Sequence, residues 1–152
     1  MASRSFATFL LNDQVFGIDI LLIREINRQL DMTAVPHAAA YIRGLLNLRG
    51  QIVTLMDLNL RLGLSPTTVS ETSHNIILKT DQELQTMGSE LITAPDKVGL
   101  LIDDIQDVVI VPEEDLEPPP ANIGRIDGQF LSAVIKQPEK LIAVLCVEKL
   151  LK

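Results

Sequence analysis

Short apolar runs alternate with polar breaks along the whole 152-residue chain. Apolar runs of this length, bounded by turn residues, are typical of β-strands, because buried helices need longer runs. The pattern predicts strands at 6–11, 15–23, 32–35, 45–48, 51–55, 75–79, 97–105, 107–111, 129–135 and 141–147. Many short strands with little helix predict an all-β fold of small barrels rather than a parallel sheet.

The segment 41–58 carries the sharpest turn signal. Two predicted strands flank Arg49 and Gly50, and a glycine supplies the positive φ that a tight hairpin turn needs. We therefore expect Arg49 at the tip of a hairpin, held by the turn and facing water, where it serves recognition rather than packing. The alternative is that Arg49 is only a solvated turn residue.

The segments between strands are predicted to be helical turns and loops. Pro36 and the alanines after it predict a short helix that ends at Gly44 in a left-handed cap. Residues 57–63 and 148–152 are expected to form helical turns. The polar segment 80–96, which contains a glycine and a proline, predicts a mobile loop that folding does not require.

The second half of the chain repeats the first. Segments 17–26 and 99–108 both begin with glycine, share four apolar positions and carry an acid eight residues after the glycine. Three further pairs keep the same order: Val35-Pro36 with Val111-Pro112, 41–46 with 130–135, and 51–55 with 140–144. Four matches in register predict two pseudo-repeated, intertwined lobes. We place them approximately at 6–63 and 75–151 of one domain, 1–152, with a shared apolar interface because each lobe alone is small.

Charge and cysteine content limit the possible partners and compartment. The net charge is −7, with +1 in residues 1–62 and −8 in residues 63–152, which argues against nucleic acid as a partner. No apolar run approaches the roughly 18 residues of a membrane helix, so we expect no direct membrane insertion. Cys146 is the only cysteine, so a reducing compartment fits, and we predict a cytoplasmic protein.

The sequence shows no catalytic or metal-binding set. Cys146 lies in an apolar run and is expected to be a buried, inert thiol. His37 and His74 lack cysteine or histidine neighbours at metal-ligand spacing. The acidic run 103–107 lacks the alternating oxygens and glycine of a calcium loop. These features indicate a binding module without metal or cofactor rather than an enzyme. A small-molecule carrier is the alternative, because a crease between two lobes can hold a ligand.

Several motifs resemble the CheW family of chemotaxis coupling proteins. They are Phe16-Gly17-Ile18-Asp19-Ile20, Ile23-Arg24-Glu25-Ile26, Val35-Pro36, Ile42-Arg43-Gly44, Asn47-Leu48-Arg49-Gly50, Leu55-Met56-Asp57-Leu58, Val98-Gly99-Leu100 through Asp103, and Asp107-Val108. The resemblance covers residues 6–151, and its most specific part is the Asn-Leu-Arg-Gly piece. It implies two intertwined five-stranded SH3-like β-barrels with a shared hydrophobic interface, and a scaffold without enzymatic activity.

The resemblance also implies two protein partners. One is the cytoplasmic hairpin tip of a chemoreceptor, and the other is the regulatory domain of the histidine kinase CheA. By family analogy the receptor-binding residues would be Ile23, Arg49, Gly99, Ile105 and Val108. Three further positions would bind a partner that is left unassigned: Glu25, Gly44 and Asn47. The implied role is a cytoplasmic adaptor recruited to membrane-associated receptor arrays, in chemotaxis or in a related system such as pilus motility.

Overall fold

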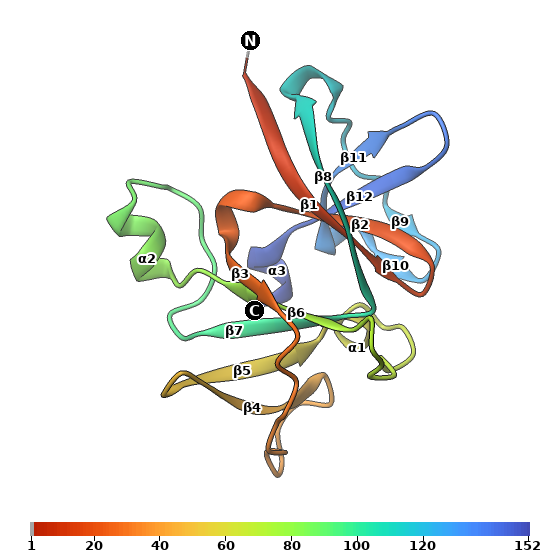
Figure 1. The fold of residues 1–152 in the computed structure, drawn as a ribbon. Coiled ribbons are helices and arrows are strands. Elements are labelled where there is room, and N and C mark those ends of the chain that lie inside the picture. Colours follow the sequence, from red (N-terminus) through yellow and green to blue (C-terminus); the bar gives the residue numbers. More distant parts are fainter. Residues whose placement is uncertain (1) are drawn as a thin grey trace.

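Two five-stranded sheets dominate the computed structural model, which describes residues 2–152 (Figure 1). The first sheet has the order β11-β12-β2-β1-β8. Its strands are β1 (Ser3–Leu11), β2 (Gln14–Asp19), β8 (Asp104–Pro112), β11 (Leu131–Lys136) and β12 (Leu141–Leu145). The prediction of a mainly β fold with short helices is confirmed.

The second sheet has the order β3-β6-β7-β5-β4. Its strands are β3 (Ile23–Asn27), β4 (Ile42–Leu48), β5 (Gln51–Asp57), β6 (His74–Leu78) and β7 (Val98–Ile102). A small hairpin and six short helices complete the fold: β9 (Asn122–Ile123), β10 (Ile126–Asp127), α1 (Leu58–Arg61), α2 (Asp81–Thr86), α3 (Val147–Leu150), and the 3₁₀ turns η1 (Ile20–Leu22), η2 (Glu113–Asp115) and η3 (Gly128–Phe130).

The two sheets have equivalent strand orders. Strands β11, β12, β2, β1 and β8 of the first sheet correspond in position to β4, β5, β7, β6 and β3 of the second. The repeated segment 17–26 runs from β2 in the first sheet to β3 in the second, and 99–108 runs from β7 back to β8. Each sheet therefore takes strands from both halves of the chain, which makes the lobes intertwined.

Three apolar clusters hold this arrangement together. One lies in the first lobe and includes Phe6 and Ile142, and another lies in the second lobe and includes Val53 and Leu101. The largest draws side chains from both sheets, among them the stacked rings of Phe9 and Phe16, Ile76 and Leu100. This shared cluster is the hydrophobic interface between the lobes, and its burial is the main stabilising term of the fold.

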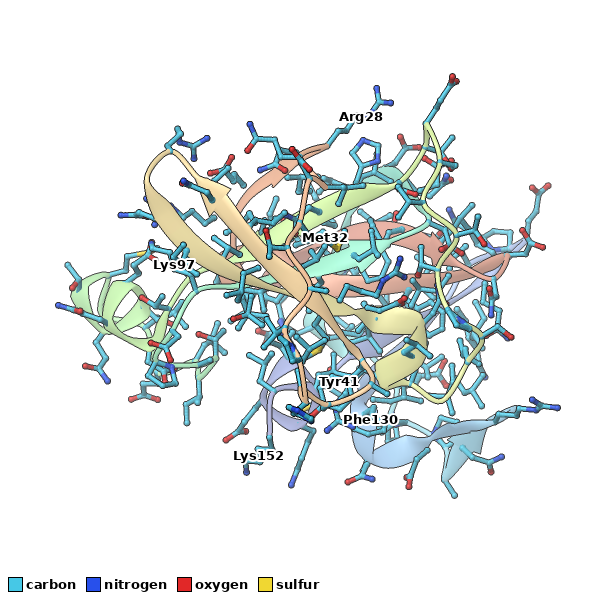
Figure 2. The ribbon with its side chains drawn as sticks, turned by 90° about the horizontal axis from the view of Figure 1, so that it is seen from below. Arg28, Met32, Tyr41, Lys97, Phe130 and Lys152 are labelled. Carbon is cyan, nitrogen blue, oxygen red and sulfur yellow. The ribbon has the colours of Figure 1, made fainter. Side chains whose placement is uncertain are left out.

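Arg61 joins the two lobes at the molecular surface. Its guanidinium lies 4.9 Å from the ring centre of Tyr41 and 4.8 Å from that of Phe130, two residues that the sequence repeat makes equivalent. Figure 2 shows both aromatic residues on neighbouring segments near Lys152. Arg61 Nε also donates to the Leu150 carbonyl at 2.7 Å. One cation thus contacts both lobes and the end of α3.

The segment after β3 differs from the prediction. Residues 36–41 form turns rather than a helix, and His37 has a φ of 63°, which is incompatible with a right-handed helix. Instead of the predicted strand 32–35, only Thr33 pairs, with Leu45 of β4. Gly44 therefore does not cap a helix, because it lies inside β4.

The segment 80–96 is not a loop throughout, because Asp81–Thr86 form α2; the mobility of the rest stays a prediction. Thr80 and Glu83 form a capping box at the start of α2, with each side chain bonded to the other residue's backbone. Leu84, in the middle of α2, is fully buried in the shared cluster. The expectation for Cys146 also fails, because β12 ends before it and the free thiol is half-buried at the start of α3.

Candidate protein-binding site

The Arg49-Gly50 turn is the two-residue hairpin that the sequence predicts. Leu48 pairs with Gln51 across it, and both central residues have positive φ, 51° for Arg49 and 84° for Gly50. These are the signs of a type I′ turn. Asn47 Oδ1 accepts a hydrogen bond of 2.9 Å from the Gly50 amide, so Asn47 stabilises the turn that presents Arg49.

Arg49 is not a free solvated residue, because its guanidinium forms an ion pair with Glu25 on β3. Its side chain is still 64% exposed, and that of Glu25 is 26% exposed. Since β3 and β4 are the two edges of the second sheet, the ion pair ties the β4–β5 turn to the opposite edge. The pair helps to close the second lobe into a barrel.

The Glu25 carboxylate is held in its charged form. The hydrogen bond from Arg49, followed by one of 3.2 Å from Asn27 Nδ2, lowers the pKa of Glu25 below its usual value. At neutral pH the site is therefore a fixed, partly exposed ion pair with a hydrogen-bonded amide beside it. Arg49 retains donors that a partner can use, because a guanidinium carries five N–H groups.

Arg24, the residue before Glu25 on β3, is held by an ion pair with Glu83 of α2. Arg24 Nη1 lies 3.2 Å from Glu83 Oε1, and Lys97 Nζ lies 3.7 Å from the same oxygen. Burial raises the pKa of Glu83, but the Thr80 hydrogen bonds and the two cations outweigh this, and the pKa is lowered. Thus Arg24 links β3 to α2, and Glu25 links β3 to the β4–β5 turn.

Apolar side chains are exposed where the chain crosses between the lobes. We call the exposed members of the two crossing segments the crossover surface: Ile20, Leu21, Ile26 and Val108. Leu21 is 52% exposed and Val108 53%. Ile23 and Ile105 lie at the half-buried edge of the shared cluster. Each of these side chains would lose apolar area to water-free contact if a partner covered it.

Two predicted site residues are packing positions. A Cβ at Gly44 would lie 2.5 Å from the Thr33 carbonyl oxygen, and one at Gly99 would lie 2.2 Å from Asn75 Oδ1. Both glycines are buried. They allow close approach of neighbouring groups, and their assignment as binding residues stays a prediction.

Sequence reasoning missed a buried polar cluster beneath α1. The Asp57 carboxylate is fully buried and accepts hydrogen bonds from Arg43 Nη1 at 2.8 Å, from the Thr67 amide at 3.0 Å and from the Thr67 hydroxyl at 2.8 Å. Asp57 also accepts from the Leu60 amide and caps α1. The only sequence signal was an aspartate before a helical turn, since its partners are distant in the chain.

Within residues 2–152, no three His, Cys, Asp or Glu side chains gather closely enough to hold a metal ion. No helix in this part of the chain is long and apolar enough to cross a membrane.

An open cleft of about 990 Å³ lies between α2 and β5, lined by Ile52, Met87 and the Arg24–Glu83–Lys97 ion pairs.

Comparison with known proteins decides the family. The sequence-family model of the CheW-like domain matches residues 5–152, nearly the whole chain. This chain belongs to the CheW-like domain family. The resemblance found in the sequence is therefore confirmed.

Relatives of this CheW-like chain include two chemotaxis proteins. It is 29% identical over 147 residues to the probable chemotaxis protein CheW of Rhizobium etli, covering 97% of this chain and 86% of that protein. It is 32% identical over 144 residues to the chemotaxis protein CheW of Treponema pallidum, covering 94% and 79%. The crystal structure of the scaffolding protein TtCheW from Thermoanaerobacter tengcongensis superposes with a TM-score of 0.82 at 26% identity, covering 100% of this chain and 90% of that one.

The predicted site residues of this CheW-like domain fall into three groups. Arg49, Glu25 and Asn47 form one polar cluster around the β4–β5 turn. The apolar residues Ile23, Ile105 and Val108 lie on the two crossing segments instead. The glycines, as shown above, are buried. Arg24 and Leu21 were not singled out from the sequence, although Arg24 lies between Ile23 and Glu25, which were.

Proposed function

We propose that this chain is a non-enzymatic adaptor that couples chemoreceptors to the histidine kinase CheA. The crossover surface binds the cytoplasmic hairpin tip of a receptor, and a second surface binds the regulatory domain of the kinase. The family assignment and the names of the relatives support a scaffold role in chemotaxis. The protein acts in the cytoplasm and is recruited to receptor arrays at the membrane.

The observation that carries the proposal is the exposure of large apolar side chains on the two crossing segments. An amphipathic helix docks through apolar anchors spaced at one-turn intervals, and a receptor tip of two helices offers such anchors. Val108 and Leu21, each about half exposed, would lose that exposure on binding. The Arg49–Glu25 pair fixes β3, the strand that carries Ile26 of this surface, and leaves the Arg49 side chain 64% exposed.

Coupling requires that both partners bind the same molecule at once. Two simultaneous contacts bring receptor and kinase together at high effective concentration. A change in receptor conformation then alters kinase activity through a coupling free energy, which is typically about 1–3 kcal/mol. Enzymatic chemistry in the adaptor itself is not needed for this mechanism.

The test is a charge swap at the turn. Arg49→Glu places two carboxylates together and should weaken binding of a receptor-tip fragment by about 2 kcal/mol, the range of an interface hot spot. Glu25→Arg added to Arg49→Glu restores an ion pair with reversed polarity. Each variant is titrated with the receptor fragment and, separately, with the kinase regulatory domain.

The pattern of binding separates the roles of Arg49. If the guanidinium contacts the receptor, the double variant stays weak although β3 is held again. If the ion pair only positions β3, the double variant recovers most of the affinity. Unchanged receptor binding in Arg49→Glu would contradict the assignment, and equal losses for receptor and kinase would contradict two separate surfaces.

A further inference from the structure

The two lobes differ where their sheet edges meet. In the second lobe, the Arg49–Glu25 ion pair joins the β4–β5 turn to the edge strand β3. The equivalent turn of the first lobe, β11–β12, contains Gln137, Pro138 and Glu139 and has no arginine. In the part of the chain that the structure describes, no ion pair joins this turn to the equivalent edge strand, β8.

A hollow of the first lobe is lined by Gln137 of this turn and by the end of β8. It has a volume of about 600 Å³ and lies between the edge strands β8 and β11. Val111 and Ile135, which line it, belong to the apolar core of the lobe. Ile110, also in the lining, is 72% exposed. Val111 and Ile135 are themselves buried, so the large apolar side chain exposed at the hollow is that of Ile110.

The edge of β8 has unpaired backbone groups at this hollow. The Glu113 amide donates to the Ala2 carbonyl at 3.1 Å, so by the alternation of an antiparallel ladder Val111 and Val109 also face β1. The N–H and C=O groups of Val108 and Ile110 then point away from β1. Because β8 is an edge strand, these groups can accept another strand.

The charge at the hollow is negative. Its lining carries Glu114, Asp115 and Glu117 against one cation, Lys136, which lies 3.4 Å from Glu117. The Lys136 and Glu117 side chains are 70% and 45% exposed, so water screens their attraction. A positively charged partner is favoured over a neutral or acidic one.

We propose that this hollow binds an extended segment of a partner protein in which basic and apolar residues alternate. The segment adds a strand to the edge of β8, covers Ile110 with its apolar side chains, and places a lysine or arginine among the three acids. The proposal rests on the hollow and on the outer edge of β8, and not on the Arg49–Glu25 ion pair; Val108, whose backbone lies on that edge, also belongs to the crossover surface.

A second copy of this chain does not fit the site. Antiparallel pairing of two β8 strands would bring the acids of both copies together, including Asp104, Asp107 and Glu113. Each copy also carries a net charge of −7. Like charges placed opposite each other destabilise a strand pair.

The experiment uses two fluorescent peptides of about eight residues, the length of an ordinary strand. In one peptide lysine alternates with valine, and in the other glutamate replaces each lysine. Anisotropy titrations with the full chain at low salt should show saturable binding of the lysine peptide and at least tenfold weaker binding of the glutamate peptide. Higher salt should weaken the lysine complex.

Three variants locate the binding. The triple variant Glu114→Gln, Asp115→Asn, Glu117→Gln should weaken the lysine peptide about tenfold. A matched triple, Glu71→Gln, Glu90→Gln, Glu148→Gln, changes the net charge equally at other places and should have less than about a twofold effect. Ile110→Pro removes an outward-pointing amide that β1 does not use, and an edge strand tolerates proline, so it should also weaken binding about tenfold. Ile110→Thr keeps the amide and tests the apolar contact separately.

Hydrogen exchange provides an independent readout. The amides of Val108 and Ile110 should exchange more slowly when the lysine peptide is bound, while those of β4 remain unchanged. Equal loss in the two triple variants, equal binding of both peptides, or no saturable binding would overturn the proposal. A dimer detected by sedimentation and abolished by Ile110→Pro would also overturn it, since the face would then bind a second copy.

Discussion

Replacing Leu84 with alanine tests whether α2 is part of the folded core. Leu84 is fully buried against the shared cluster, and Leu→Ala at such sites costs about 2–5 kcal/mol. We therefore expect Leu84→Ala to reduce the free energy of unfolding by about 2–5 kcal/mol.

The assay is urea unfolding followed by far-ultraviolet circular dichroism, because the chain has no tryptophan. Met87→Ala is the matched control, since Met87 follows α2 and its side chain is 56% exposed. This control should change stability by about 0.5 kcal/mol or less, as surface substitutions usually do. If Leu84→Ala is no more costly than Met87→Ala, α2 contributes nothing to the core and the reasoning fails.

Three other outcomes follow from single contacts. Gly99→Ala should reduce the free energy of unfolding by about 1–3 kcal/mol, because its Cβ would lie 2.2 Å from Asn75 Oδ1; adding Asn75→Ala should recover most of the loss in the same urea titration. Arg61→Lys should lower the melting temperature by about 2–5 °C, because lysine lacks the planar guanidinium that arginine stacks on the two rings. Glu25→Gln should destabilise the protein at neutral pH, since Arg49 lowers the pKa of Glu25. The destabilisation relative to wild type should have its full size above pH 4.5, the ordinary pKa of a glutamate. It should become smaller as the pH falls below this value, because the wild-type carboxylate is then protonated. Urea midpoints measured across this pH range check the prediction.

Local pattern was enough to predict the strands and the repeat. Short aliphatic runs between turn residues mark most strands, and the glycine of 17–26 and of 99–108 marks equivalent strands of the two sheets. The Arg49-Gly50 hairpin also followed from two flanking strands and one glycine. In these places local propensity and tertiary structure agree.

The errors arose where distant contacts decide the local structure. Alanine-rich residues 36–41 favour a helix. They lie in the connection between Thr33 and Leu45, however, and this connection must turn back so that the two residues can pair. The capping-box pattern of Thr80 and Glu83 was readable in the sequence, yet the burial of the adjacent leucine required the shared cluster. The Arg49–Glu25 pair joins opposite edges of a barrel, and nothing in either local sequence specifies it.

A pair of titrations on the Val108→Glu variant tests the adaptor model most directly. A receptor-tip fragment and the CheA regulatory domain are each titrated into wild type, Val108→Glu and the control Val69→Glu, whose valine is 45% exposed on the connection between β5 and β6. The model predicts that Val108→Glu weakens receptor binding by about 2 kcal/mol, changes kinase binding by less than about 0.5 kcal/mol, and that the control affects neither. Equal weakening of both partners, or full receptor affinity in Val108→Glu, would contradict the model.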